Sequence, residues 1–302
     1  MDFVTTIVSI IIMILIGVLL RYFNVLKAED NETLNKVVVN VALPCMIFNA
    51  LYSANVSLLP SLSILTVFIL ICSLIVGIIT YLILKYLGYD KKALWSILIV
   101  VLLGNTGFLG YPICQGLFGI DGLVRAAFCD LSTSILFISI SIILMLIFDG
   151  SIKNAVKKLV TFMPLWGIIF GILLNVFSIS IGDLGSSLIT YLSGATVPMI
   201  MISLGLSLNL RGFKRHLKEV SLSSFIKLII YPIIGFGVLT LLGVTGLERN
   251  IGLIESAMPS AMLCLILAIQ FNLDTDLTSD CIFSNTLISL ITIPIILFFF
   301  II

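Results

Sequence analysis

The residue of this chain best suited to bind a small solute is an asparagine placed where a helix should fail. Asn105 lies in "LLGNTGFLGYPICQGLFG" (102–119), in which glycines and a proline weaken a helix. Its amide offers two donors and an acceptor, which suits a carboxylate without adding a charge that would hold it too tightly. The alternative is that Asn105 only caps backbone groups freed by the break. The predicted substrate-binding residues of this stretch are Asn105, Thr106, Gly107, Gly110 and Pro112.

Three ionisable residues within apolar stretches form a second group of candidates. Asp130 lies in "AAFCDLSTS", Glu255 lies four residues before Pro259, and Lys227 lies just ahead of "YPIIG". An ionisable residue inside a membrane span costs roughly 2.5–3.5 kcal/mol on insertion scales, so each requires a reason. We predict that the two acids carry a coupling proton or sodium ion and that Lys227 balances charge or attracts an anion. The alternatives are acids hydrated at the outer interface and a lysine that snorkels inward.

The composition places these candidates in a membrane. Of the 302 residues, 60% are hydrophobic and only 10% are charged, whereas soluble domains carry about 25% charged residues. A net charge of +1 gives no support for a nucleic-acid partner. The six cysteines form no CxxC pair and the chain has a single histidine, so no catalytic residue, metal site or cofactor is expected. The predicted class is an all-α integral membrane protein that is not an enzyme.

Ten apolar segments are long enough to cross a bilayer, which takes about 20 residues per helix. Most of the 16 basic residues fall on one side if the N-terminus is outside. Because Lys and Arg accumulate in cytoplasmic loops, we expect a multi-pass protein with both termini outside. The segments lie near residues 3–22, 33–52, 60–86, 93–117, 123–148, 161–181, 184–209, 219–243, 249–271 and 277–301.

The longest polar connection, "DGSIKNAVKK", divides the chain into halves of opposite orientation. We predict a first five-helix repeat at 1–148, a short cytoplasmic linker at 149–160 and a second, inverted repeat at 161–302. Prolines fall at matching positions, in the second segment of each half and in the fourth, and we expect them to interrupt these helices. The predicted substrate-binding residues outside the 102–119 stretch are Pro44, Pro198, Met258, Pro259 and Ser260.

Segments four and nine are predicted to be broken helices that cross near the bilayer midplane. Unwound backbone is tolerated at that depth only where it is buried in protein or lines a water-filled cavity. The partial positive charge of two helix N-termini would favour an anion such as a carboxylate there. The alternative is that these glycines and prolines are packing notches or simple kinks.

Four stretches together resemble one protein family. They are "GNTGFLGYP", "LPCMIFNAL", "ESAMPSAMLCLILAIQFNLDTDL" and "LISLITIPIIL", and the likeness covers essentially the whole chain. They are similar to the auxin efflux carrier family, and most of all to its bacterial permeases, whose plant relatives export auxin. The chain departs from the plant proteins in its short central loop and in carrying Glu255 where they have an uncharged residue, so auxin itself is not the expected substrate.

The resemblance implies a fold like that of bile-acid sodium symporters and sodium/proton antiporters. It implies a scaffold made of helices one, two, six and seven, a moving unit made of the others, and a homodimer through the scaffold. It also implies that the crossover holds an organic anion, with Asn105 at the position of the family's asparagine.

Residues and resemblance together predict a secondary transporter in a bacterial-type cytoplasmic membrane. It would move a small organic anion, such as malate, malonate or another carboxylate, by an elevator-like motion coupled to protons or sodium ions. The main alternative is a monovalent cation/proton antiporter of the same architecture. A channel would use the broken helices as a fixed filter without a moving half.

Overall fold

The computed structural model describes residues 3–27, 30–54, 59–148, 160–161, 163–207 and 216–300. Throughout this part of the chain the regular structure is helical, with no strand longer than one isolated bridge. Six helices are long and apolar enough to cross a bilayer, and two shorter apolar helices accompany them. The expectation of an all-α membrane protein is thus met. The predicted linker at 149–160 falls, except for residue 160, outside the described residues.

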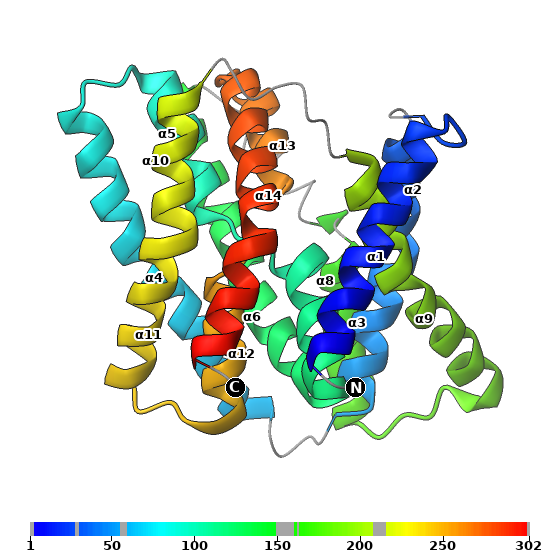
Figure 1. Cartoon of the computed structure of the whole chain (residues 1–302). Helices are drawn as coiled ribbons and strands as arrows, with labels where there is room; N and C mark the ends of the chain where they lie inside the picture. The colour runs from blue at the N-terminus through cyan, green and yellow to red at the C-terminus, as the bar shows by residue number, and fades with distance from the viewer. Residues whose placement is uncertain are drawn as a thin grey trace. The chain divides into compact units, whose positions relative to one another are not determined.

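The chain forms two compact units, and each draws on both halves of the sequence. The first comprises Met1–Ser61, Tyr111–Ala127 and Lys157–Leu208. Its helices, labelled in Figure 1, carry the predicted segments one, two, six and seven, which the resemblance assigned to a scaffold. They are α1 (Phe3–Tyr22), α2 (Asp30–Val37), the π-helix η1 (Val38–Ala42), α3 (Leu43–Tyr52), α8 (Met163–Val176) and α9 (Gly182–Ser207), together with the start of α6.

Glycines allow the helices of the first unit to pack backbone to backbone. A Cβ on Gly205 of α9 would lie 2.9 Å from the Cα of Gly17 in α1 and would overlap the carbonyl oxygen of Ile14. A Cβ on Gly167 of α8 would lie 2.6 Å from the carbonyl oxygen of Pro44 in α3. Small residues at helix contacts are a common device in membranes, where close approach of backbones supplies van der Waals contact.

The second unit comprises Leu62–Gly110, Phe128–Val156 and Asn209–Ile302. Two of its predicted membrane segments, four and nine, are divided, and the second part of segment four continues into segment five as α6. Predicted segments one and six correspond to the two shorter apolar helices of the first unit, so six long apolar helices are present where ten were expected. The elements of the second unit are α4 (Leu59–Tyr86), α5 (Lys91–Leu102), the π-helix η3 (Thr106–Gly110), the remainder of α6, α10 (Leu217–Phe225), the π-helix η4 (Ile226–Ile230), α11 (Tyr231–Leu241), α12 (Gly246–Ser256), α13 (Leu263–Gln270) and α14 (Thr275–Phe300).

Helix α6 (Tyr111–Phe148) is shared by the two units and bends at Gly119, whose φ of 63° and ψ of −149° lie outside the helical region. A residue with a Cβ rarely adopts this φ, so glycine suits the position. The bend lies between predicted segments four and five.

A π-helical turn precedes the proline at three places. The turns η1, η3 and η4 end two residues before Pro44, Pro112 and Pro232. In η3, for example, the Gly110 N–H donates to the carbonyl of Asn105, five residues back. A proline cannot donate to the carbonyl four residues earlier and its ring crowds that group, so a wider turn accommodates it without ending the helix.

The expectation that prolines interrupt segments two and seven is therefore wrong. Pro44 is the second residue of α3, and the helical path continues through η1 into it. Pro198 lies inside the continuous helix α9. Neighbouring helices can accommodate a proline in a membrane helix, and in α9 the hydroxyl of Thr196 donates to the carbonyl of Ala42 at 2.8 Å.

Candidate functional site

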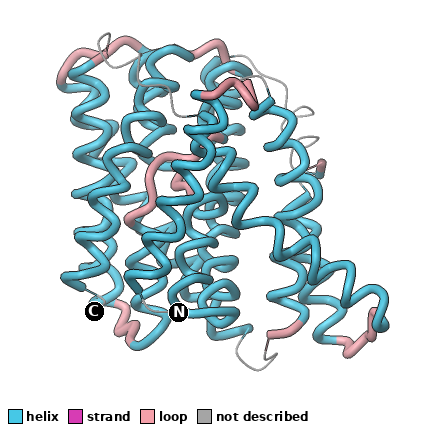
Figure 2. Tube along the Cα trace, turned by 45° about the vertical axis from the view of Figure 1, so that its right-hand side comes forward, coloured by secondary structure: helices cyan, strands magenta, loops and turns pink. Residues whose placement is uncertain are grey.

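Two interrupted helices of the second unit cross and complete each other's backbone hydrogen bonding. Segment four leaves helical geometry after Leu102, and segment nine does so after Ser256. The Asn105 N–H donates to the Pro259 carbonyl at 2.6 Å, and the Ala261 N–H donates to the Leu103 carbonyl at 2.8 Å. Figure 2 draws such non-helical stretches as loops within the helical trace. Because each break satisfies backbone groups of the other, the two breaks stabilise one another.

The Asn105 side chain caps the break and still has donors available for a second role. Its side-chain oxygen accepts from the Phe108 N–H at 3.2 Å, so the residue does cap the turn that follows. Its Nδ2 group makes no hydrogen bond to another described residue. Asn105 is 4% exposed. The cap uses the acceptor of the amide and leaves its two donors for a ligand.

Thr106 joins the break to a buried acid. Its hydroxyl donates to Oδ1 of Asp130 at 2.5 Å and lies 3.0 Å from the hydroxyl of Thr133. Asp130 is 8% exposed, which disagrees with the alternative that it is hydrated at the outer interface. Thr106 follows Asn105 directly in the chain. A change in the charge of Asp130 would therefore alter a hydrogen bond of the residue next to Asn105.

Glu255 approaches the same break from the other segment. It is 2% exposed and lies in the last turn of α12, again unlike a carboxylate hydrated at the interface. A Cβ on Gly110 would overlap the Glu255 carboxylate, so the acid rests directly against the backbone of η3. Glycine suits position 110 because any side chain there would occupy the space of the Glu255 carboxylate.

Lys227 is the buried cation of this site. It lies in η4, is 1% exposed, and its Nζ lies 4.1 Å from the centre of the Tyr231 ring. The same Nζ would lie 3.3 Å from a Cβ on Gly104, next to Asn105. Among the described residues it makes no ion pair. Its burial disagrees with the alternative of a lysine that snorkels to the interface.

Two buried polar residues that the sequence predictions missed, Asn285 and Ser224, connect to the predicted Ser260 at the second break. Ser260 donates to the Val100 carbonyl at 2.7 Å, and Asn285 donates from Nδ2 to Ser260 at 2.7 Å. Ser224 in turn donates to Oδ1 of Asn285 at 2.6 Å. All three side chains are buried. An amide within the apolar run of "CIFSNTLISLITIP" is the signal that could have identified Asn285, because polar residues in spans are costly.

The structure assembles most of the predicted site residues in one unit and leaves three outside it. Pro44, Pro198 and Pro112 belong to the first unit, where Pro44 contacts α8 and Pro198 lies in α9. The predicted residues found within the second unit are Asn105, Thr106, Gly107, Gly110, Met258, Pro259, Ser260, Asp130, Glu255 and Lys227.

This assembly combines several features that suit an anion. The breaks are followed by the N-termini of η3 and α13, whose first N–H groups carry partial positive charge. A buried ammonium and an amide with two available donors lie beside them. The two buried carboxyl groups next to the same backbone offer sites for a proton or a monovalent cation.

Comparison with known proteins gives a consistent picture. A family model described as "Membrane transport protein" matches residues 2–154 and 147–297. An uncharacterized transporter of Methanothermobacter thermautotrophicus is 40% identical over 290 residues, covering 96% of each chain. An uncharacterized transporter of Methanocaldococcus jannaschii is 38% identical over 293 residues, covering 95% of each chain. Both relatives are named as transporters, in agreement with the expectation that the chain is not an enzyme.

Proposed function

We propose that this chain, which belongs to the auxin efflux carrier family of membrane transport proteins, is a secondary active transporter of a small organic anion. The observation that carries the proposal is the burial of Lys227 beside Gly104, the residue that precedes Asn105. A buried ammonium is costly unless an anion or a set of strong acceptors compensates it. The ring of Tyr231 offers partial compensation through its π face.

A carboxylate would supply the missing negative charge. It would bind the ammonium of Lys227, accept from Nδ2 of Asn105, and benefit from the helix N-termini that follow the breaks. The residues present suit a carboxylate such as malate, malonate or a related anion. A single amide and a single lysine bind it firmly enough to select it and weakly enough to release it.

Asp130 and Glu255 are the proposed sites of ion coupling. Asp130 accepts from Thr106, so adding a proton or a sodium ion at Asp130 would alter a hydrogen bond one residue away from Asn105. Glu255 rests on the backbone of η3, so its charge state acts on the same turn. Occupancy of the ion site and of the anion site would thereby favour each other, which is what a symporter requires.

The remaining features of the proposal concern architecture and cellular setting. Ten spans in two inverted repeats would place the crossover near the bilayer midplane, and the second unit would move against the first in an elevator-like step. Two copies would associate through the first unit. The protein would lie in the cytoplasmic membrane with both termini outside, as the distribution of basic residues predicts.

Transport by purified protein in vesicles tests the proposal. Radiolabelled mono- and dicarboxylates are supplied under imposed proton or sodium gradients, and Lys227→Met is compared with Lys218→Met, an exposed lysine in the preceding helix. We expect saturable carboxylate uptake that Lys227→Met lowers at least tenfold and Lys218→Met leaves unchanged. Equal uptake by the two variants would remove Lys227 from the site and with it the support for an anionic substrate.

A monovalent cation/proton antiporter is the second candidate, because two buried carboxyl groups lie beside the breaks. The variants Asp130→Asn and Glu255→Gln distinguish the two activities. For an anion symporter, they should abolish gradient-driven accumulation and retain carboxylate exchange across the vesicle membrane. For an antiporter, they should abolish sodium- or potassium-driven proton movement, and the unaltered protein should move no carboxylate at all.

A further inference from the structure

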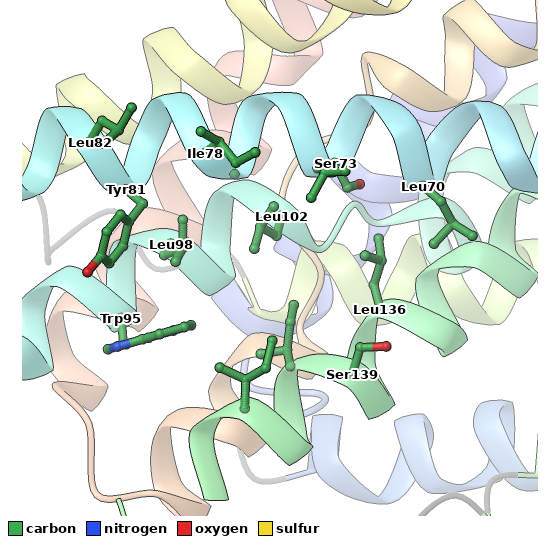
Figure 3. A pocket seen from close by; sticks show the side chains of 14 residues that line it. Leu70, Ser73, Ile78, Tyr81, Leu82, Trp95, Leu98, Leu102, Leu136 and Ser139 are labelled. Atoms are coloured by element: carbon green, nitrogen blue, oxygen red, sulfur yellow. The ribbon is translucent and has the colours of Figure 1, made fainter. Parts of the chain in front are cut away.

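A long apolar groove lies in the second unit and extends as far as Leu102, the last helical residue before the first break. It has a volume of about 660 Å³ and is bounded by α4, α5 and the second half of α6 (Figure 3). Most of the lining residues are aliphatic: Leu70, Leu74, Ile78, Leu82, Leu98, Leu102, Leu136, Ile140 and Ile143. The groove therefore suits a hydrocarbon rather than a polar solute.

The few hydroxyl groups in its wall do not make it polar. Ser139 donates to the Ile135 carbonyl at 2.8 Å within its own helix. The Ser73 hydroxyl lies 2.6 Å from that of Tyr231. Both serine hydroxyls are therefore engaged by the protein, and none of the described residues that line the groove is charged.

The dimensions of the groove match one leaflet of a bilayer. Leu70 and Leu82 lie near its opposite ends in Figure 3 and belong to the same helix. At 1.5 Å per residue, their separation along α4 is about 18 Å. One leaflet contributes about 15 Å of hydrocarbon to the core of a bilayer. An acyl chain of a lipid could thus lie along the groove over most of its length.

One end of the groove carries polar and basic groups suited to a lipid headgroup. Tyr81 and Trp95 lie at that end in Figure 3, and neither the Tyr81 hydroxyl nor the Trp95 indole N–H bonds to another described residue. The Nζ of Lys85 lies 6.0 Å from the centre of the Tyr81 ring. Lys91 and Lys92 open the helix that contains Trp95, and all three lysines are exposed. Aromatic rings and basic side chains of this kind gather at the level of anionic headgroups.

We propose that this α4–α5–α6 groove binds an acyl chain of an anionic phospholipid, whose headgroup is held by Tyr81, Trp95 and the three lysines. The apolar wall excludes the headgroup from the groove, and the two unused donors suit phosphate or ester oxygens. The lysines select a negative headgroup over a zwitterionic one. This proposal is independent of the transported substrate.

Quenching of tryptophan fluorescence by brominated lipids tests the site directly. The chain has two tryptophans, so Trp166→Phe leaves Trp95 as the only reporter. The protein is reconstituted with phosphatidylcholine or phosphatidylglycerol brominated on the acyl chains, and the relative affinity is obtained from quenching in mixtures. We expect the anionic lipid to be preferred, and replacing Lys85, Lys91 and Lys92 by glutamine to lower the preference about fivefold per lysine.

Filling the groove provides the second measurement. Leu136→Phe with Ser139→Phe adds bulk to the lining of the groove, whereas Ile142→Phe with Leu146→Phe adds it to exposed positions of the same helix that do not line it. Only the first pair should reduce quenching of Trp95. Equal quenching by the two lipids, or quenching that the groove-filling pair leaves unchanged, would overturn the proposal. A third outcome would also overturn the proposal. If brominated lipids do not quench Trp95 and a Trp95→Cys variant forms cross-links between two copies of the protein, the groove binds a second copy instead of a lipid.

Discussion

Glycines serve different purposes at two places in this protein. In the first unit, glycines of continuous helices bring backbones into contact, as Gly17 of α1 does against Gly205 of α9. At the interrupted helices of the second unit, the spaces beside Gly104 and Gly110 are taken by the charged side chains of Lys227 and Glu255. Residue type alone therefore does not distinguish a glycine that serves packing from one at the candidate site. The group that occupies the space next to the glycine distinguishes them.

The largest effect is expected where a glycine faces backbone. Gly205→Ala would place a Cβ 2.9 Å from the Cα of Gly17, and neither helix can yield without a shift of its backbone. Overpacking against backbone should cost about 3 kcal/mol of stability, the upper end of the usual range, and lower the folded yield strongly at moderate temperature. Gly194→Ala is the control in the same helix, because nothing lies within 4 Å of a Cβ there. Thermal unfolding in detergent measures both, and comparable melting temperatures for the two variants would contradict the packing role.

A different outcome is expected where a glycine faces a carboxylate. The Glu255 side chain can rotate away from a Cβ on Gly110, so Gly110→Ala should fold normally. A displacement of about 1 Å at a catalytic or coupling group can cost about a hundredfold in rate, so coupled uptake should fall by that order. Gly237→Ala, with open space around its Cβ, should transport normally.

The shorter acid sharpens this second prediction. Adding Glu255→Asp to Gly110→Ala makes room for the new methyl group and should restore part of the coupled uptake. If Gly110→Ala lowers the melting temperature as much as Gly205→Ala does, then Gly110 serves packing in the same way as Gly205 and the assigned difference between the two glycines is wrong.

The smallest of these effects is expected at Asn105, which caps the break and is the proposed ligand of the substrate. Losing a hydrogen bond to a charged group costs about 1.5–3 kcal/mol, so Asn105→Ala should weaken substrate binding by roughly ten- to a hundredfold. Asn105→Asp keeps the acceptor that caps Phe108 but loses the donors, and it should fold well and bind poorly. Substrate-induced thermal stabilisation separates the effects. Normal stabilisation of a folded Asn105→Asp protein would leave Asn105 with the cap alone.

The positions of several membrane helices, the break near Asn105 and the ionisable candidate residues could be predicted from residue type and order. An apolar run has to become a helix in lipid because its backbone must be hydrogen-bonded internally, so the span predicted at 3–22 coincides with α1 and that at 60–86 lies within one residue of α4. The glycines and the proline around Asn105 indicated a break in such a helix because these residues weaken helical structure. Asp130, Glu255 and Lys227 were identifiable because ionisable groups are rare in such runs.

Only the tertiary structure decided which of these residues meet. Pairing of Asn105 with Pro259, contact of Glu255 with Gly110, and the link from Asn285 to Ser260 join residues far apart in the chain, and no local pattern encodes them. Pro44 and Pro259 were both predicted to bind substrate, yet Pro44 packs against Gly167 and Pro259 lies at the crossover. A proline only withholds a local hydrogen bond. Whether the helix widens, continues or breaks depends on which distant groups supply the hydrogen bonds and fill the space around it.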